Sequence, residues 1–212
     1  MTTTAAAGQA RRELIELGAA TLAESGAVPL SPRIRPMWKG AAFAGPALTV
    51  ACAAGDNLAV HAAVAVARPG DVVAFSLAGD PARGYWGEVL TTAAQAAGVA
   101  ALVIDGAVRD VAAIEQHGFP VFATGIALRG AAKAGPGSLR VPIALGDAIV
   151  RPGDWLAGDA DGVVAIAAGD LADCRAVGAA RRAREAGFLT RLRSGASTVD
   201  LLALDTGPIE NA

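Results

Sequence analysis

Hydrophobic positions along the chain fall into short apolar runs and alanine-rich stretches, separated by Gly, Pro and Asp. Apolar runs of about four to eight residues between turn signals are typical of buried strands, and longer stretches that end at Gly or Pro are typical of helices. The pattern predicts an α/β domain. The predicted helices are 9–25, 57–67, 88–97, 111–117 and an amphipathic C-terminal helix at 171–192. The predicted strands are 43–53, 72–76, 99–104, 120–123, 141–149, 155–157 and 162–166, with a loop at 130–140.

One pair of neighbouring elements has a predictable geometry. Residues 88–97 (EVLTTAAQAA) contain no Gly or Pro and are followed by Gly98, which favours a helix that stops there. A ten-residue helix is about 15 Å long, and a six-residue strand at 99–104 spans about 20 Å. Because only a glycine turn separates the two, they must run antiparallel. The start of the helix and the end of the strand therefore lie at the same edge of the domain.

The residues at these two ends carry the candidate chemistry. Backbone N–H groups of Gly87, Glu88 and Val89 are expected to share one pocket mouth with the side chains of Glu88, Arg109 and Asp110. A helix N-terminus favours bound anions. Mg²⁺ and Mn²⁺ prefer oxygen ligands and keep several waters, so one or two carboxylates suffice. The sequence predicts an anion-binding helix terminus beside an acid that can hold a metal and a fixed cation.

Each of these residues also has a structural interpretation. Asp110 could cap the helix that follows it, and Gly87 could serve only a turn. For Tyr85 and Trp86 core packing is favoured over a role as a pocket wall. His61, in an alanine-rich helix, is expected to be a packed or surface histidine.

Composition and charge exclude several classes of function. The net charge of −2 and the scattered arginines argue against nucleic-acid binding. Cys52 and Cys174 form neither a metal motif nor a disulfide framework, which is typical of a reducing cytosol. The N-terminus lacks a secretion signal. The longest uncharged runs, 41–55 and 89–104, are shorter than the roughly 18–20 apolar residues of a membrane span. We therefore expect a cytoplasmic protein without nucleic-acid or membrane partners.

The stretch 79–110, with WGEVLTTAA and VIDGAVRD, resembles the family that contains the 4-hydroxy-4-methyl-2-oxoglutarate/4-carboxy-4-hydroxy-2-oxoadipate aldolases and the regulator of ribonuclease E activity A. The resemblance extends in order over about residues 15–200. Its other matches are IRP at 34–36, GPALTV at 45–50, GDNLAVHAAVAVARPGDVV at 55–73, GFPVFATG at 118–125 and RPGDWLAGDADGVVAI at 151–166. Single motifs such as RPGD are weak, but the ordered set is specific.

The resemblance implies a swivelling β/β/α single domain that spans residues 1–212 and ends in a helix. It also implies a homotrimer or a hexamer made of two trimers, with active sites at the subunit interfaces. Aldolases of the family use an acidic residue from the C-terminal region of the neighbouring subunit. Glu185 is the candidate for that residue here.

The resemblance further assigns roles to the predicted pocket. Arg109 would contact the pyruvyl part of the substrate, and Asp110 would organise the divalent metal, partly through water. The segment of Gly87, Glu88, Val89 and Leu90 would present N–H groups to the substrate carboxylate. Glu88 stands where many aldolases of the family carry Asp.

These observations predict a lyase that depends on Mg²⁺ or Mn²⁺ and cleaves a 4-hydroxy-2-oxo acid to pyruvate, with oxaloacetate decarboxylation as a side activity. Arg109 would stabilise the enolate, and Glu88 or another carboxylate would hold the water that removes the C4 hydroxyl proton. No lysine lies in these motifs, which argues against a Schiff-base aldolase. Two alternatives remain open: a ribonuclease regulator that acts by protein contact, and a lyase for another 2-oxo acid.

Overall fold

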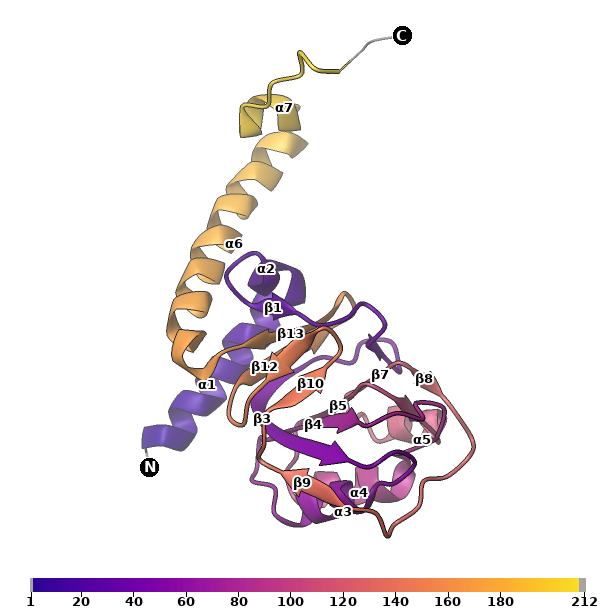
Figure 1. The fold of residues 1–212 in the computed structure, drawn as a ribbon. Coiled ribbons are helices and arrows are strands. Elements are labelled where there is room, and N and C mark those ends of the chain that lie inside the picture. The colour runs from indigo at the N-terminus through magenta and orange to yellow at the C-terminus, as the bar shows by residue number, and fades with distance from the viewer. Residues whose placement is uncertain (1, 210–212) are drawn as a thin grey trace.

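A nine-stranded mixed sheet forms the centre of the computed structural model, which describes residues 2–209 (Figure 1). Its strand order is β1-β13-β12-β3-β4-β5-β7-β2, and β9 pairs with β3 away from this path. The strands of the sheet are β1 (Val28–Pro29), β2 (Arg35–Pro36), β3 (Phe43–Cys52), β4 (Val72–Leu77), β5 (Ala101–Ile104), β7 (Val121–Ala123), β9 (Gly137–Leu139), β12 (Trp155–Asp159) and β13 (Gly162–Ile166). Two small sheets pair β6 (Ala107–Val108) with β8 (Gly125–Ile126) and β10 (Ile143–Leu145) with β11 (Ala148–Val150).

The helices fall into two groups. Helices α3 (Leu58–Ala65), α4 (Glu88–Ala96) and α5 (Val111–Gln116) follow parallel strands and cover one face of the sheet. Helices α1 (Thr2–Leu17), α2 (Ala19–Ala23) and the first turns of α6 (Leu171–Arg193) pack against β12 and β13. A single 3₁₀ turn, η1 (Ala168–Asp170), leads into α6, and α7 (Thr198–Leu202) follows it.

The parallel strands β3, β4, β5 and β7 place the candidate site. They are buried on both faces, by α3 and α4 on one side and by the β10–β11 hairpin on the other. Strands that are buried on both faces have continuous apolar sequences, so these strands could be predicted from the sequence. The predicted α/β class with a C-terminal helix is confirmed, and most of the predicted elements are present within a few residues of their expected ends.

Two predicted elements are wrong. The helix expected at 9–25 is interrupted at Gly18, which has a φ of +80° and starts a second helix whose Ala19 N–H donates to Asp159 Oδ2 at 2.8 Å. The strand expected at 141–149 is a hairpin that turns at Gly146, with a φ of +59°. Both errors come from a glycine inside an apolar stretch, which the periodicity alone did not weigh as a turn. The expected loop at 130–140 also contains β9.

The two Arg-Pro-Gly-Asp tetrapeptides form the same turn. The Arg68 N–H donates to Asp71 Oδ2 at 2.8 Å, and the Arg151 N–H donates to Asp154 Oδ2 at 2.8 Å. In each turn the Asp side chain closes the loop and directs the chain into a strand, β4 in the first case and β12 in the second.

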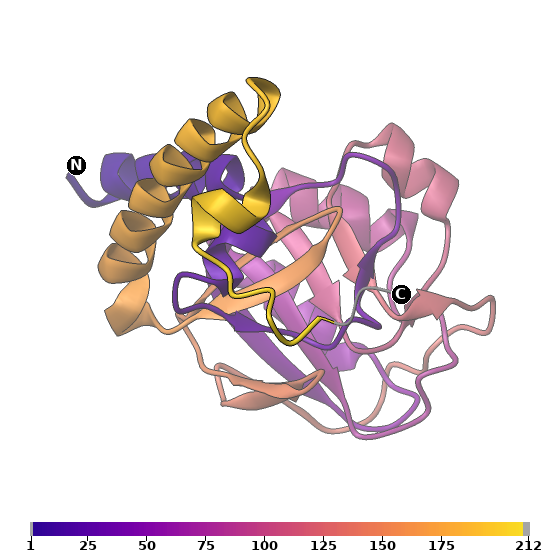
Figure 2. The same cartoon turned by 90° about the horizontal axis from the view of Figure 1, so that it is seen from above.

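Helix α6 projects away from the rest of the fold. Figure 1 shows its second half and α7 extending beyond the sheet, and Figure 2 shows the same fold from above. Cys174 and Gly178, both in its first half, are its buried residues. Among the described residues, 2–209, no helix has the length and apolarity that a membrane span requires.

Candidate functional site

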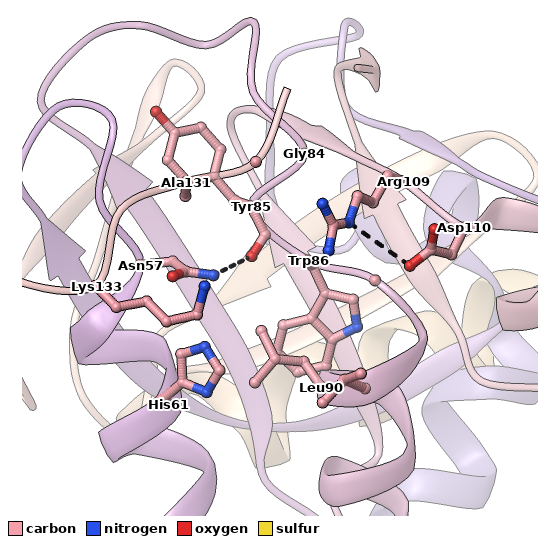
Figure 3. A pocket seen from close by; sticks show the side chains of 13 residues that line it. Asn57, His61, Gly84, Tyr85, Trp86, Leu90, Arg109, Asp110, Ala131 and Lys133 are labelled. Atoms are coloured by element: carbon pink, nitrogen blue, oxygen red, sulfur yellow. Dashed lines mark hydrogen bonds and ion pairs between the residues drawn. The ribbon is translucent and has the colours of Figure 1, made fainter. Parts of the chain in front are cut away.

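A pocket of about 190 Å³ opens where the start of α4 meets the end of β6, the start of α3 and the loop 129–136 (Figure 3). Parallel β-strands deliver α3 and α4 to this edge of the sheet, and ligands of α/β folds bind at the corresponding edge. The pocket is lined by Asn57, His61, Gly84, Tyr85, Trp86, Gly87, Val89, Leu90, Arg109, Asp110, Gly130, Ala131 and Lys133.

The two predicted segments meet in this pocket. The Glu88 N–H donates to Asp110 Oδ2 at 3.1 Å, and Arg109 Nε lies 3.7 Å from the same oxygen. The Arg109 N–H donates to the Trp86 carbonyl at 2.8 Å, which fixes the two segments side by side. The antiparallel helix and strand therefore bring together the residues that the sequence singled out.

The backbone of Asp110 explains how its side chain reaches α4. Asp110 precedes α5 with a φ of +57° and a ψ of +35°, and its side chain does not cap that helix. Asp and Asn tolerate this left-handed conformation better than most residues. The carboxylate turns instead to the first turn of α4, where it accepts from the Glu88 N–H, so the alternative that Asp110 caps α5 is wrong. About 42% of the side chain remains exposed, which leaves oxygen surface available to a ligand.

Gly87 and Gly84 make room for the charged pair. A Cβ at position 87 would lie 2.3 Å from Asp110 Oδ2 and 3.2 Å from Arg109 Cγ. A Cβ at position 84 would lie 2.5 Å from the Ala127 carbonyl oxygen and 3.0 Å from Arg109 Cβ. The φ of Gly87 is −158°, an extended value open to any residue, so space rather than backbone conformation requires glycine there. Gly87 allows Asp110 and Arg109 to lie against the α4 terminus, and Gly84 allows the close approach of Arg109 and the Ala127 carbonyl.

Tyr85 and Trp86 serve the core and the pocket at once. Both are fully buried. The Trp86 ring stacks on Phe119 with 6.0 Å between centroids, and its Nε1 donates to Thr91 Oγ1 at 2.8 Å. Tyr85 also lies in the core, edge-on to Phe75. The favoured core role is present, and the same two residues line the pocket.

The side chain of Glu88 is directed away from the pocket. Its Oε1 lies 3.6 Å from His117 Nε2, and about 57% of the side chain is exposed. Its neighbours Gly87, Val89 and Leu90 line the pocket, so the segment contributes there mainly through backbone and apolar groups.

Sequence reasoning missed three polar side chains that line the pocket, those of Asn57, His61 and Lys133. Figure 3 shows the Lys133 side chain ending beside Asn57 and His61. His61 is partly buried, as expected for a packed or surface histidine, and it also lines the pocket. Asn57 and His61 are four residues apart at the start of α3, a spacing that places them on one side of a helix and could have revealed them. Lys133 lies in a loop that gave no such signal, and it removes the sequence-based argument against a lysine in the site.

Asp56 fixes the loop that carries Lys133. Its carboxylate is buried and accepts hydrogen bonds from the N–H groups of Ala134 at 2.7 Å, Leu58 at 2.8 Å and Gly135 at 2.8 Å. These bonds, that of Ala134 first, hold the pKa of Asp56 below its ordinary value. The Asp56 carboxylate thus connects the start of α3 to the loop on the far side of the pocket.

Asp110 is the residue that fits a divalent cation. Among residues 2–209, no group of three or more His, Cys, Asp or Glu side chains is placed to enclose a metal ion. Hard cations such as Mg²⁺ retain water and bind through one or two carboxylates together with substrate oxygens. The partly exposed carboxylate of Asp110 could hold such a water-rich cation together with substrate oxygens.

Comparisons with known proteins agree with this architecture. The RraA-like family, described as Aldolase/RraA, matches residues 19–165. A protein of Halalkalibacterium halodurans named "Putative 4-hydroxy-4-methyl-2-oxoglutarate aldolase" is 41% identical over 144 residues, which are 68% of this chain and 69% of that protein. The structure of Streptomyces coelicolor RraAS2, described as an unusual member of the RNase ES inhibitor RraA family, has a TM-score of 0.74 and 26% identity over 87% of this chain and 96% of that one. The RNA-processing inhibitor RraA of Thermus thermophilis has a TM-score of 0.60 and 27% identity over 66% and 84% of the two chains.

Proposed function

Because this chain belongs to the Aldolase/RraA family, we propose that it is a divalent-metal-dependent aldolase. Its substrate would be 4-hydroxy-4-methyl-2-oxoglutarate or 4-carboxy-4-hydroxy-2-oxoadipate, and pyruvate would be a product. The observation that carries the proposal is the meeting of Arg109, Asp110 and the α4 N-terminus in one pocket. The name of the Halalkalibacterium halodurans relative supports the same reaction class.

The start of α4 is the proposed site for the substrate carboxylate. The N–H groups of Val89 and Leu90 belong to the first turn, where no helical carbonyl is available to accept them. The N–H of Glu88 is already donated to Asp110. A carboxylate bound at Val89 and Leu90 would place the adjacent 2-oxo group near Arg109.

Arg109 supplies the positive charge for the chemical step. When the C3–C4 bond breaks, its electrons remain on the pyruvyl fragment as an enolate, and the guanidinium stabilises that charge more strongly than it stabilises the substrate. Asp110 would hold Mg²⁺ or Mn²⁺, which when bound supplies a Lewis acid for the 2-oxo group. The sequence predicted that Glu88 holds the water that takes the hydroxyl proton, but the Glu88 carboxylate lies beside His117 and outside the pocket lining.

Oxaloacetate tests the enolate part of the site. Loss of carbon dioxide from oxaloacetate leaves the same pyruvate enolate, so the same residues would promote it. Purified protein with Mg²⁺ or Mn²⁺ should release pyruvate from oxaloacetate and from 4-hydroxy-4-methyl-2-oxoglutarate. If neither compound yields pyruvate with any divalent cation, the proposed function is wrong.

Arg109→Ala should lower turnover of both compounds by about 10²–10³-fold, the effect of losing one donor to a developing oxyanion. Arg33→Ala is a matched control, because Arg33 is an exposed arginine paired with Asp105 outside the pocket lining. The control should keep wild-type rates. Near-normal activity of Arg109→Ala would place the chemistry elsewhere.

Lys133 makes a second experiment necessary. Pyruvate and borohydride would trap any Schiff base as a stable adduct detected by mass spectrometry. We expect no adduct, because the proposed reaction polarises the 2-oxo group without a covalent bond to the protein. An adduct on Lys133 would replace the metal-dependent scheme with a covalent one.

The likeness to RraAS2 favours a second candidate function, inhibition of a ribonuclease by protein contact. Such a protein would have no need of Arg109 and Asp110. Inhibition of a ribonuclease E by the wild type and by Arg109→Ala alike, without pyruvate release by either, would establish this candidate instead.

A further inference from the structure

Two unpartnered polar atoms lie at one end of the pocket. Within residues 2–209, three buried side-chain polar atoms have no hydrogen-bond partner: Thr49 Oγ1, Asn57 Oδ1 and His61 Nε2. Asn57 and His61 line the pocket, whereas Thr49 belongs to the central strand β3. Buried polar atoms are rarely left without a partner, because an unmet hydrogen bond is destabilising. Two such atoms at one end of the pocket are therefore candidate partners for a bound ligand.

The surroundings determine what these atoms can bind. Asn57 Nδ2 donates to the Tyr85 carbonyl at 2.7 Å, so the free Oδ1 is an acceptor. Burial lowers the pKa of His61, and the Lys133 cation lowers it further. A neutral ring beside a cation keeps its lone pair on the nitrogen that faces the charge. In Figure 3 the Lys133 amine lies beside both residues, so two acceptors and one donor share this end of the pocket.

The other titratable groups near this end are already engaged or lie farther along the pocket. Tyr85 Oη accepts from the Gly55 N–H and donates to the Asp80 carbonyl. Asp56, at the turn before α3, is held by three N–H groups. Arg109 and Asp110 interact with each other at the opposite end. Of the groups named here, His61 is therefore the one that is neutral and has an acceptor atom without a partner.

We propose that His61 Nε2 is the base that accepts the C4 hydroxyl proton during aldol cleavage. This inference rests on the proposed aldolase function. The O–H bond breaks as the N–H bond forms, the C4–O bond becomes a carbonyl, and the electrons of the C3–C4 bond pass to C3 as the enolate. The imidazolium then returns its proton to C3, which gives pyruvate and the neutral ring. Lys133 donates to the C4 oxygen throughout.

Glu88 is the competing base, and the geometry favours His61 over it. The Glu88 carboxylate lies beside His117, largely exposed and outside the pocket lining. A general base must lie within hydrogen-bond reach of the proton that it removes. His61 lines the pocket and its acceptor atom is free.

Two reactions of the same enzyme separate this role from the proposed function. Cleavage of 4-hydroxy-4-methyl-2-oxoglutarate requires removal of a hydroxyl proton, whereas decarboxylation of oxaloacetate does not. His61→Asn should lower cleavage by at least 100-fold, within the range of about 10²–10⁴-fold for general acid–base catalysis. It should lower decarboxylation far less, so the ratio of the two rates falls at least tenfold. Glu88→Gln should leave this ratio unchanged.

The outcomes are distinct. An equal loss of both reactions in His61→Asn would reduce His61 to a structural residue and overturn the inference. A fall in the ratio in Glu88→Gln but not in His61→Asn would assign the base to Glu88. A wild type that catalyses neither reaction would overturn the proposed function, and the inference with it.

The pH dependence of cleavage gives a second test, because a purely structural role of His61 would not set the midpoint of the pH profile. Cleavage by the wild type should decline on the acid side as His61 is protonated, with a midpoint below the ordinary histidine pKa of about 6.5. Lys133→Met removes the neighbouring cation, so the midpoint of the profile should rise toward the ordinary histidine pKa. This test does not depend on whether His61→Asn folds. His117→Asn changes the other histidine and should keep the wild-type midpoint. If the midpoint of the decline at low pH is the same in Lys133→Met as in the wild type, the proposal is wrong.

Discussion

Gly87 shapes the site because it has no side chain. The carboxylate of Asp110 and the stem of Arg109 occupy the space that a Cβ would fill. A glycine before a helix is usually explained by the turn it permits, and the extended backbone of Gly87 shows that this is not the reason here. The sequence indicated that Gly87 mattered, but the clash that explains it involves residues that follow it by more than twenty positions.

Gly87→Ala should therefore impair activity more than stability. The new methyl group would displace the Asp110 carboxylate from the α4 terminus, and we expect pyruvate release to fall at least tenfold. Gly187→Ala is the matched control, because no atom lies within 4 Å of a Cβ at this exposed position in α6. The control should keep full activity and raise the free energy of unfolding by up to about 1 kcal/mol. Steady-state kinetics and urea unfolding of both variants measure this contrast, and unchanged activity in Gly87→Ala would contradict the steric account.

Asp110 and Arg109 were identifiable from the sequence because a helix, a glycine turn and a strand relate them locally. Asn57, His61 and Lys133 were not, because they reach the pocket from segments whose relative position depends on the whole sheet. The spacing of Asn57 and His61 indicated a shared helix side but not what that side faces. Local geometry thus predicted one end of the pocket, and long-range packing set the other.

The same distinction holds at the scale of elements. Strands such as β4 and β13 were predicted almost residue for residue, because continuous burial leaves an unbroken apolar run. The β10–β11 hairpin was read as one strand because its turn lies at Gly146 within an apolar stretch. The pairing of β9 with β3 depends on contacts between segments far apart in the chain, so no local pattern could reveal it.

The buried carboxylate of Asp56 holds the loop 129–136 in position. Asp56→Ala would leave the N–H groups of Ala134, Gly135 and Leu58 without their acceptor. We expect the free energy of unfolding to fall by about 2 kcal/mol and KM to rise, because Lys133 loses its fixed position. Chemical denaturation and steady-state kinetics measure the two effects. Wild-type values for both would show that the loop holds its place without Asp56.

The stabilisation from Asp56 should also depend on pH. Its pKa is lower in the folded state than in the unfolded chain, where it is about 3.9. Its contribution is therefore complete above that unfolded value and is lost as pH falls through the folded pKa. The difference in unfolding free energy between wild type and Asp56→Ala should be constant near neutral pH and shrink below about pH 4. A difference that grows on acidification would contradict this sign.

At the scale of the whole molecule, the second half of α6 and α7 form an arm with little support from its own fold. The arm carries an apolar groove lined by Glu185, Phe188, Leu189, Leu192, Thr198, Leu201 and Leu202. Glu185 forms an ion pair with Arg181, with 2.8 Å between Oε1 and Nε, and it belongs to α6, which Figure 1 shows on the opposite side of the fold from α5. The family resemblance predicts that Glu185 contributes to the pocket of another copy.

We expect the protein to be a trimer or a hexamer in solution, so light scattering should give a mass that is a multiple of three chains of 21.0 kDa. Leu189→Glu introduces a charge on the arm and should lower this mass. Val177→Glu is the matched control, because Val177 is similarly exposed (52% against 51%) but lies in the first half of α6. The control should keep the wild-type mass. A monomeric, fully active wild type would exclude a shared active site.

The left-handed backbone at Asp110 has an evolutionary consequence. Asparagine and glycine occupy that conformation with little penalty, whereas most other residues are disfavoured there by about 1 kcal/mol or more. A single nucleotide change converts an aspartate codon into an asparagine codon, which removes the charge and keeps the shape. Descendants of such a protein could thus lose their chemistry in one step while the scaffold survives intact. A lineage built on this turn is well placed to yield both catalysts and inert binding proteins.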